Sequence, residues 1–102
     1  MNKLIIDTTD SKKTTIRLHL GDKVHELTEE NVPKSQVALI LIDKLFRKNK
    51  IKPKDIDEVE VNTGPGSFTG TRVGVSIANA FGFGLNTPVN KSKTKQVQPK
   101  YF

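Results

Sequence analysis

The residues best suited to chemistry form a glycine-rich run from Asn62 to Arg72, Asn-Thr-Gly-Pro-Gly-Ser-Phe-Thr-Gly-Thr-Arg. An alternating segment over 56–63 precedes it and predicts a strand, and the residues from about Thr69 to Phe83 predict a helix. A strand that passes through glycines into a helix N-terminus is typical of anion-binding corners in α/β proteins. A tight structural turn has the same appearance, so both interpretations stay open for Gly64, Gly66, Ser67 and Thr69.

Two charged residues near this corner are candidates for a role there. Arg72 lies in the first helical turn, where a cation opposes the helix macrodipole, so it either extends into solvent or holds a carboxylate or phosphate. Asp7 ends the first predicted strand and is a candidate internal partner for Arg72. Neither residue completes a catalytic set with a nucleophile and a base.

The nucleotide and metal motifs that would make the corner an enzyme site are missing. The run lacks the Gly-Lys-Ser/Thr ending of a P-loop, and its third glycine falls one residue too late for G-x-G-x-x-G. His19 and His25 fall on opposite faces of a predicted hairpin and cannot share a metal. We therefore expect no catalytic residue, no metal site and no cofactor bound by this chain.

Composition favours one small domain. The 102 residues are 34% hydrophobic, include no cysteine and contain no apolar run long enough to span a membrane. These features, and the lack of a signal-peptide pattern at the N-terminus, favour a cytoplasmic protein. The net charge of +6 is uneven: residues 61–102 carry five basic side chains and no acid. We expect a basic, flexible tail over 90–102, for which contact with RNA phosphates is the less favoured alternative.

The order of elements predicts an α/β fold with a mixed sheet, β-β-β-α-β-α-β. Strands are predicted at 4–6, 14–20 and 24–28, the last two joined by a Gly21-Asp22 hairpin turn that sets Arg17 opposite Glu26. A helix is predicted from an N-cap at Ser35 to about Asn49. A last short strand is predicted at 86–89.

Both predicted helices have more apolar or small surface than one sheet face requires. The first helix is apolar nearly all round, including Val37 and Leu41. In the second, Gly70, Gly74, Ala78 and Gly82 form a row at spacing four, suited to close approach of another helix. Val73, Ile77, Ala80, Phe81 and Leu85 form a separate stripe that we expect to face the sheet. The second buried side is either packing between these two helices or a partner protein.

The residues Gly64-Pro-Gly-Ser-Phe-Thr-Gly-Thr-Arg-Val-Gly74 resemble the signature of the TsaB (YeaZ) family. Ile5-Ile6-Asp7-Thr8-Thr9, Pro53-Lys54-Asp55-Ile56-Asp57 and Gly84-Leu85-Asn86-Thr87-Pro88-Val89 are similar to that family in the same order, so the resemblance covers residues 1 to about 89. It implies an actin-like (ribonuclease-H-like) single lobe. Members are usually about twice this length, so we expect a one-lobe form or a truncated product.

The resemblance also implies a function. TsaB proteins are non-catalytic accessory subunits in the synthesis of threonylcarbamoyladenosine in tRNA. They pair through their two helices with a catalytic threonylcarbamoyltransferase (TsaD-like), and an ATPase subunit (TsaE-like) joins them. The resemblance implies that ATP and metal bind to the partner subunits, and that tRNA is contacted indirectly or through the tail. It also implies that the chain can form a homodimer. The interface expected here comprises Val37, Leu41, Gly70, Gly74, Ile77, Ala78 and Phe81. The alternatives are a small RNA-binding module and an inactive homodimeric remnant, with ATPase or peptidase activity the least favoured.

Overall fold

Alternation of apolar and polar residues in three consecutive segments builds most of the sheet. A computed structural model describes residues 1–30 and 34–90. Its strands are β1 (Asn2–Asp7), β2 (Lys13–Leu20), β3 (Lys23–Glu30) and β4 (Glu58–Val61). They lie in the order β3-β2-β1-β4, with β4 parallel to β1 and the other neighbours antiparallel. The predicted mixed sheet is confirmed.

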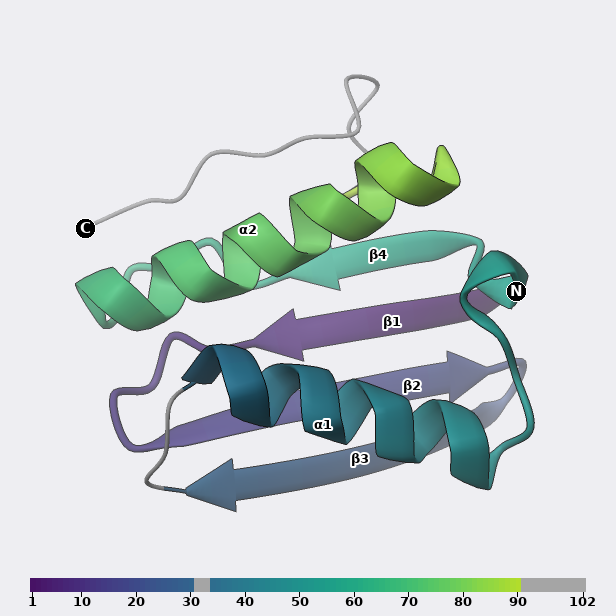
Figure 1. Cartoon of the computed structure of the whole chain (residues 1–102), viewed down its shortest axis with the longest axis horizontal. Coiled ribbons are helices and arrows are strands. Elements are labelled where there is room, and N and C mark those ends of the chain that lie inside the picture. Colours follow the sequence, from purple (N-terminus) through teal and green to yellow (C-terminus); the bar gives the residue numbers. More distant parts are fainter. Residues whose placement is uncertain (31–33, 91–102) are drawn as a thin grey trace.

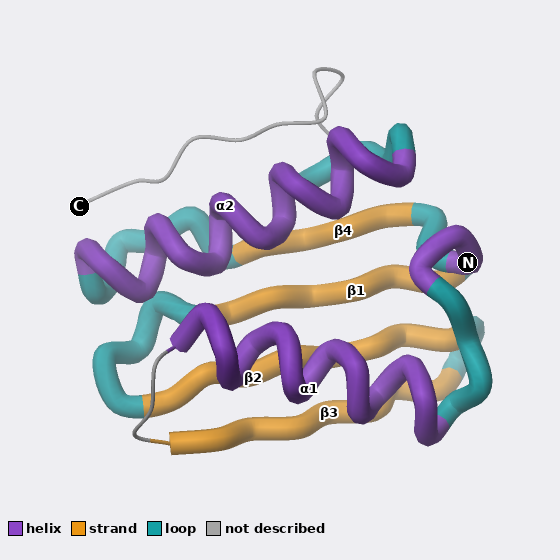
Figure 2. Tube along the Cα trace, viewed as in Figure 1, coloured by secondary structure: helices purple, strands orange, loops and turns teal. Residues whose placement is uncertain are grey.

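Two helices cover the same face of this sheet (Figures 1 and 2). They are α1 (Lys34–Lys48) and α2 (Phe68–Leu85), and a short 3-10 helix, η1 (Pro53–Asp55), precedes β4. In the described part of the chain, neither helix is long and apolar enough to cross a membrane. Because α1 begins at Lys34, Ser35 lies within the first helical turn, and its prediction as the N-cap is wrong.

The β2–β3 hairpin has the predicted register. Gly21 takes a positive φ of 60° in the two-residue turn, and Arg17 pairs with Glu26 across the strands. The Arg17 Nε and a Glu26 carboxylate oxygen are 2.5 Å apart. This ion pair is about half exposed, so it contributes little to stability, and its main effect is to favour one register.

The core lies between the sheet and the helices. Alternate residues of β1 and β2 point toward the helices and are fully buried, which the period of two in a strand requires; they are Leu4, Ile6, Ile16 and Leu18. Leu41 and Leu45 of α1 and Val75 and Ala78 of α2 meet them. The two helices also touch each other, since the rings of Phe46 and Phe81 pack edge to face with centroids 6.5 Å apart.

The row of small residues on α2 packs on the sheet, so the prediction that it faces another helix is wrong. Gly70, Gly74, Ala78 and Gly82 are all buried. A Cβ on Gly74 would collide with the Thr8 hydroxyl and lie 3.4 Å from a methyl of Val61. The small residues therefore let α2 approach the ends of β1 and β4. The stripe that we expected on the sheet, including Val73 and Ile77, is instead only half-buried, and Ala80 is exposed.

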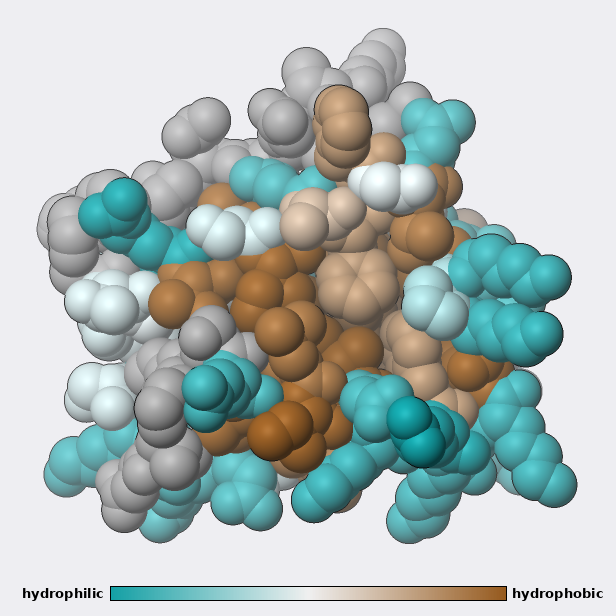
Figure 3. Space-filling view, viewed as in Figure 1, coloured by the Kyte–Doolittle hydropathy of each residue, from teal (hydrophilic) through white to brown (hydrophobic). Residues whose placement is uncertain are grey.

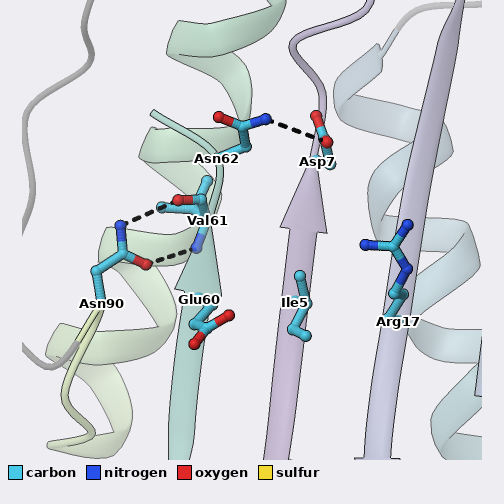
Figure 4. Close-up of a pocket in the computed structure, with 7 residues that line it drawn as sticks. All are labelled: Ile5, Asp7, Arg17, Glu60, Val61, Asn62 and Asn90. Atoms are coloured by element: carbon cyan, nitrogen blue, oxygen red, sulfur yellow. Dashed lines mark hydrogen bonds between the residues drawn. The ribbon is translucent and has the colours of Figure 1, made fainter. Parts of the chain in front are cut away.

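The predicted last strand is reduced to a single parallel bridge between Val59 and Val89. Asn90, predicted as the first residue of the tail, belongs to this edge of the sheet. Its side-chain oxygen accepts a hydrogen bond from Val61 N at 2.8 Å, and its side-chain nitrogen donates to Val61 O at 3.0 Å (Figure 4). The rest of the predicted tail, 91–102, lies outside the described residues.

Candidate functional site

The carboxyl ends of β1 and β4 meet the N-terminus of α2, which brings the predicted corner together around the turn after Asp7. Ser67 N donates to Thr9 O at 2.7 Å, and Thr8 Oγ1 donates to Gly70 O. Gly66 is required for close approach, because a Cβ there would lie 2.6 Å from the Thr9 Cβ. The glycines thus let the corner close over the 8–9 turn.

Several backbone amides of the corner are engaged within the chain. Gly64 N donates to the Asn62 side chain at 3.1 Å, and Gly70 N donates to the hydroxyl of Ser67, the N-cap of α2, at 3.2 Å. Thr71 N donates to Ser67 O at 2.8 Å. Amides that cap their own turn are not directed at an anion, so this geometry favours the structural interpretation of the corner over the phosphate cradle.

Asp7 is held as a carboxylate by its neighbours (Figure 4). One carboxylate oxygen accepts from Thr9 N at 3.0 Å and from Thr9 Oγ1 at 2.7 Å, and the other accepts from Asn62 Nδ2 at 3.3 Å. Burial raises the pKa of Asp7, but the hydrogen bonds from Thr9 and Asn62 and the charge of Arg17 together bring it below its usual value.

A polar hollow of about 490 Å³ opens beside Asp7 on the sheet face opposite the helices. It is lined by Ile5, Asp7, Arg17, Glu60, Val61, Asn62 and Asn90. Sequence reasoning did not single out Glu60, Asn62 or Asn90, although the parity of the strands signals that Ile5, Asp7 and Arg17 share one face. The hollow combines both signs of charge with amides, a set suited to a small polar group.

Arg72 lies on a different surface from Asp7. It is exposed on α2 and lines an apolar hollow of about 350 Å³ with Thr69, Val73, Ser76 and Ile77. The charge that lowers the pKa of Asp7 is that of Arg17, on the neighbouring strand. The predicted pairing of Asp7 with Arg72 is therefore replaced by the contacts of Asp7 with Thr9 and Asn62.

The outer surface of the two helices is unusually apolar. Leu39 and Ile40 of α1 are 52% and 53% exposed, and Phe83 of α2 is 80% exposed. Ile77 and Phe81 of α2 are only partly buried against the core. A space-filling view shows apolar side chains gathered over and between α1 and α2 (Figure 3). We call Leu39, Ile40, Ile77, Phe81 and Phe83 the helix face.

This arrangement revises which residues can meet a partner. Of the predicted interface, Val37, Leu41, Gly70, Gly74 and Ala78 are buried within the monomer and support the fold. Ile77 and Phe81 stay accessible in part. Leu39, Ile40 and Phe83, which the predicted interface omitted, are large apolar side chains that are at least half exposed, among those helix residues whose side chains the structure describes. Their exposure depends on how each helix is rotated on the sheet, which the sequence pattern alone does not decide.

Two observations bear on metal binding and proton transfer at the corner. Within residues 1–30 and 34–90, no group of three or more His, Asp or Glu side chains is placed to hold a metal ion. The carboxylate of Asp7 adjoins the corner, and its oxygens accept hydrogen bonds from Thr9 and Asn62. A deprotonated carboxylate saturated in this way is a poor general acid.

The mixed sheet with two helices on one face defines an actin-like α/β lobe, and solved structures share it. YeaZ from Pseudomonas aeruginosa superimposes with a TM-score of 0.83 at 22% identity, over 87% of this chain and 43% of YeaZ. A crystal structure of an uncharacterized protein described as similar to the peptidase YeaZ from Pseudomonas aeruginosa gives 0.82 at 22% identity, over 86% and 41%. The chain thus spans less than half the length of each.

The family model described as TsaD, tRNA N6-adenosine threonylcarbamoyltransferase, matches residues 32–93, which is more than half of the chain. The chain belongs to this family. Among curated proteins, no match is found. The resemblance to TsaB (YeaZ) that the corner residues carry is confirmed by the shared fold and by this family.

Proposed function

We propose that this chain is a non-catalytic subunit in the threonylcarbamoylation of tRNA adenosine, and that it pairs with the catalytic threonylcarbamoyltransferase through the helix face. The observation that carries the proposal is the exposure of Leu39, Ile40 and Phe83 on two helices already packed on one sheet. Contiguous exposed apolar surface of this kind marks protein–protein interfaces. The family supports a role in this tRNA modification.

The non-catalytic role is supported by the chemistry of the corner. Its amides cap the α2 turn and its carboxylate is saturated by Thr9 and Asn62. In this proposal ATP and metal belong to the catalytic and ATPase subunits, and the chain acts by binding. A homodimer through the same face is the state expected when the catalytic subunit is absent.

The test is size-exclusion chromatography of this chain mixed with the purified catalytic subunit. We expect a heterodimer, and we expect Ile40→Glu to weaken it at least tenfold because a carboxylate is buried against apolar surface. Val24→Glu is the matched control, since Val24 is 58% exposed but lies on β3, away from the helix face. Separate elution of the unmodified proteins, or equal loss with both variants, would overturn the proposal.

A further inference from the structure

The end of α1 and the connection to β4 carry a concentration of positive charge. Residues 44–54 contain six basic side chains and no acidic one, and all six are exposed. Four of them alternate along the connection, Lys48, Lys50, Lys52 and Lys54, and we call these the lysine stripe. The stripe was not apparent from charge counts over the first 60 residues, where 12 basic and 11 acidic residues nearly cancel.

The fold holds the stripe outward along one edge of the molecule (Figure 1). Helix α1 ends in a Schellman motif, in which Ile51 N donates to Phe46 O at 3.0 Å and Lys50 N donates to Arg47 O at 3.2 Å. Lys50 takes the left-handed conformation of that motif, with φ 56°, where glycine is the usual residue. Ile51 packs against the core, so the lysines on either side of it point to solvent.

The charges of the stripe are not neutralised by neighbouring carboxylates. In the described part of the chain, none of the four lysines forms an ion pair, whereas Arg47 pairs with Asp43 at 3.0 Å. Asp55 and Asp57 lie next to the stripe and bind backbone amides, since Asp55 accepts from Lys52 N at 2.8 Å and Asp57 accepts from Asn2 N at 2.7 Å. Their two negative charges offset part of the field, but the four lysines outnumber them, so the edge keeps a net positive charge. A row of unpaired lysines at one edge produces a local positive field.

We propose that the lysine stripe binds the phosphate backbone of RNA, and specifically of the tRNA that the complex modifies. Lys48 ends α1, Lys50 and Lys52 lie in the connection, and Lys54 lies in η1, so the four exposed lysines follow one another along a single segment. Exposed lysines clustered in this way bind phosphates whatever the base sequence. Pro53, within the stripe, also lines an apolar hollow with Phe81 and Leu85 at the rim of the helix face. A partner seated on that face therefore brings its tRNA beside the stripe. The choice of tRNA rests on the proposed function; the basic surface does not.

The test is fluorescence anisotropy with an unmodified tRNA transcript and the isolated full chain, from 50 to 200 mM salt. One variant combines Lys48→Gln, Lys50→Asn, Lys52→Gln and Lys54→Gln, with asparagine at position 50 because it tolerates a positive φ. The matched control removes the same charge elsewhere, by changing Lys91, Lys93, Lys95 and Lys100 to Gln. Thermal melts of both variants verify folding.

We expect the stripe variant to bind tRNA at least tenfold more weakly at 50 mM salt. We also expect weaker salt dependence, with the negative slope of log K against log salt reduced in magnitude by about three. The control should change both quantities much less. An equal or larger loss in the control would assign RNA binding to residues 91–102 and overturn the proposal. Absence of tRNA binding by the unmodified chain would also overturn the proposal. If polyglutamate competes for the chain as well as unlabelled tRNA does, the stripe binds an acidic protein partner instead, and the proposal is overturned. Co-elution with the catalytic subunit does not depend on these lysines, so failure of either proposal is recognised separately.

Discussion

At the scale of single residues, Gly74 and Thr8 set how closely α2 approaches the sheet. We expect Gly74→Ala to destabilise the fold by about 1–3 kcal/mol, because the new methyl collides with the buried Thr8 hydroxyl. Urea unfolding measures this loss. Gly84→Ala is the matched control: nothing lies within 4 Å of a Cβ there, so replacing a helical glycine should stabilise by up to about 1 kcal/mol.

The Gly74 prediction has an internal check in Thr8. If the collision is the cause, Thr8→Ala should recover part of the stability when combined with Gly74→Ala, although it costs stability alone by removing the bond to Gly70 O. Strict additivity of the two changes would contradict the assignment. The same geometry shows that a bulky residue at position 74 tests folding and does not probe a partner interface.

Asp7 gives the corner a predictable pH dependence. Its folded-state pKa lies below the ordinary value, so its carboxylate contributes stability above the unfolded pKa, and that contribution is lost as pH falls through the folded value. We expect Asp7→Asn to lower the free energy of unfolding by about 1 kcal/mol at pH 7. As the pH falls below the folded-state pKa, the two proteins should converge in stability. A difference that is independent of pH would show that the charge of Asp7 is not what stabilises the turn.

At the scale of elements, α2 depends on its N-cap more than its sequence suggests. The helix has no acidic residue in its first turn, so Ser67 is the residue whose side chain satisfies a terminal amide. We expect Ser67→Ala to cost about 1 kcal/mol in thermal or urea unfolding. Ser76→Ala on the exposed side of the same helix should be neutral or slightly stabilising. Equal losses at the two serines would argue against the cap.

In α1 and α2, the residues that are buried and the residues that are exposed differ from those that the sequence pattern predicts. Helix α1 buries Ala38, Leu41 and Leu45 and leaves Leu39 and Ile40 exposed, so its excess apolar surface faces solvent. Helix α2 uses its small residues on the sheet and packs Phe81 against Phe46 of α1. Apolar side chains therefore gather on the surface of both helices (Figure 3).

At the scale of the whole molecule, the helix face and the lysine stripe are adjacent but chemically separate. We expect Ile40→Glu to leave tRNA binding by the isolated chain within about twofold, because its added charge lies away from the connection between α1 and β4. The stripe variant should still co-elute with the catalytic subunit. These two measurements form a cross-check, and loss of both functions in either variant would show that the surfaces are not independent.

The sequence by itself determined the order of the elements, the hairpin register and the family. Each depends on local patterns: a period of two in Thr14–Leu20, the Gly21 turn, and the spacing of glycines from Gly64 to Gly74. The same patterns showed that α2 has two surfaces, a small row and an apolar stripe. They did not show which surface meets the sheet, because hydrophobic periodicity indicates that a helix side is buried without identifying what buries it.

The tertiary structure alone decided those matters of orientation. The crossing of α2 over β1 and β4 placed Gly74 on Thr8 and Phe81 on Phe46 of α1. The parallel pairing of β4 with β1 brought Asn62 to Asp7 from 55 residues away. The end of α1 and the connection to β4 brought together four exposed lysines that a charge count over the first 60 residues does not reveal. In each case the deciding quantity is a distance between residues far apart in the chain, and such distances are set by packing.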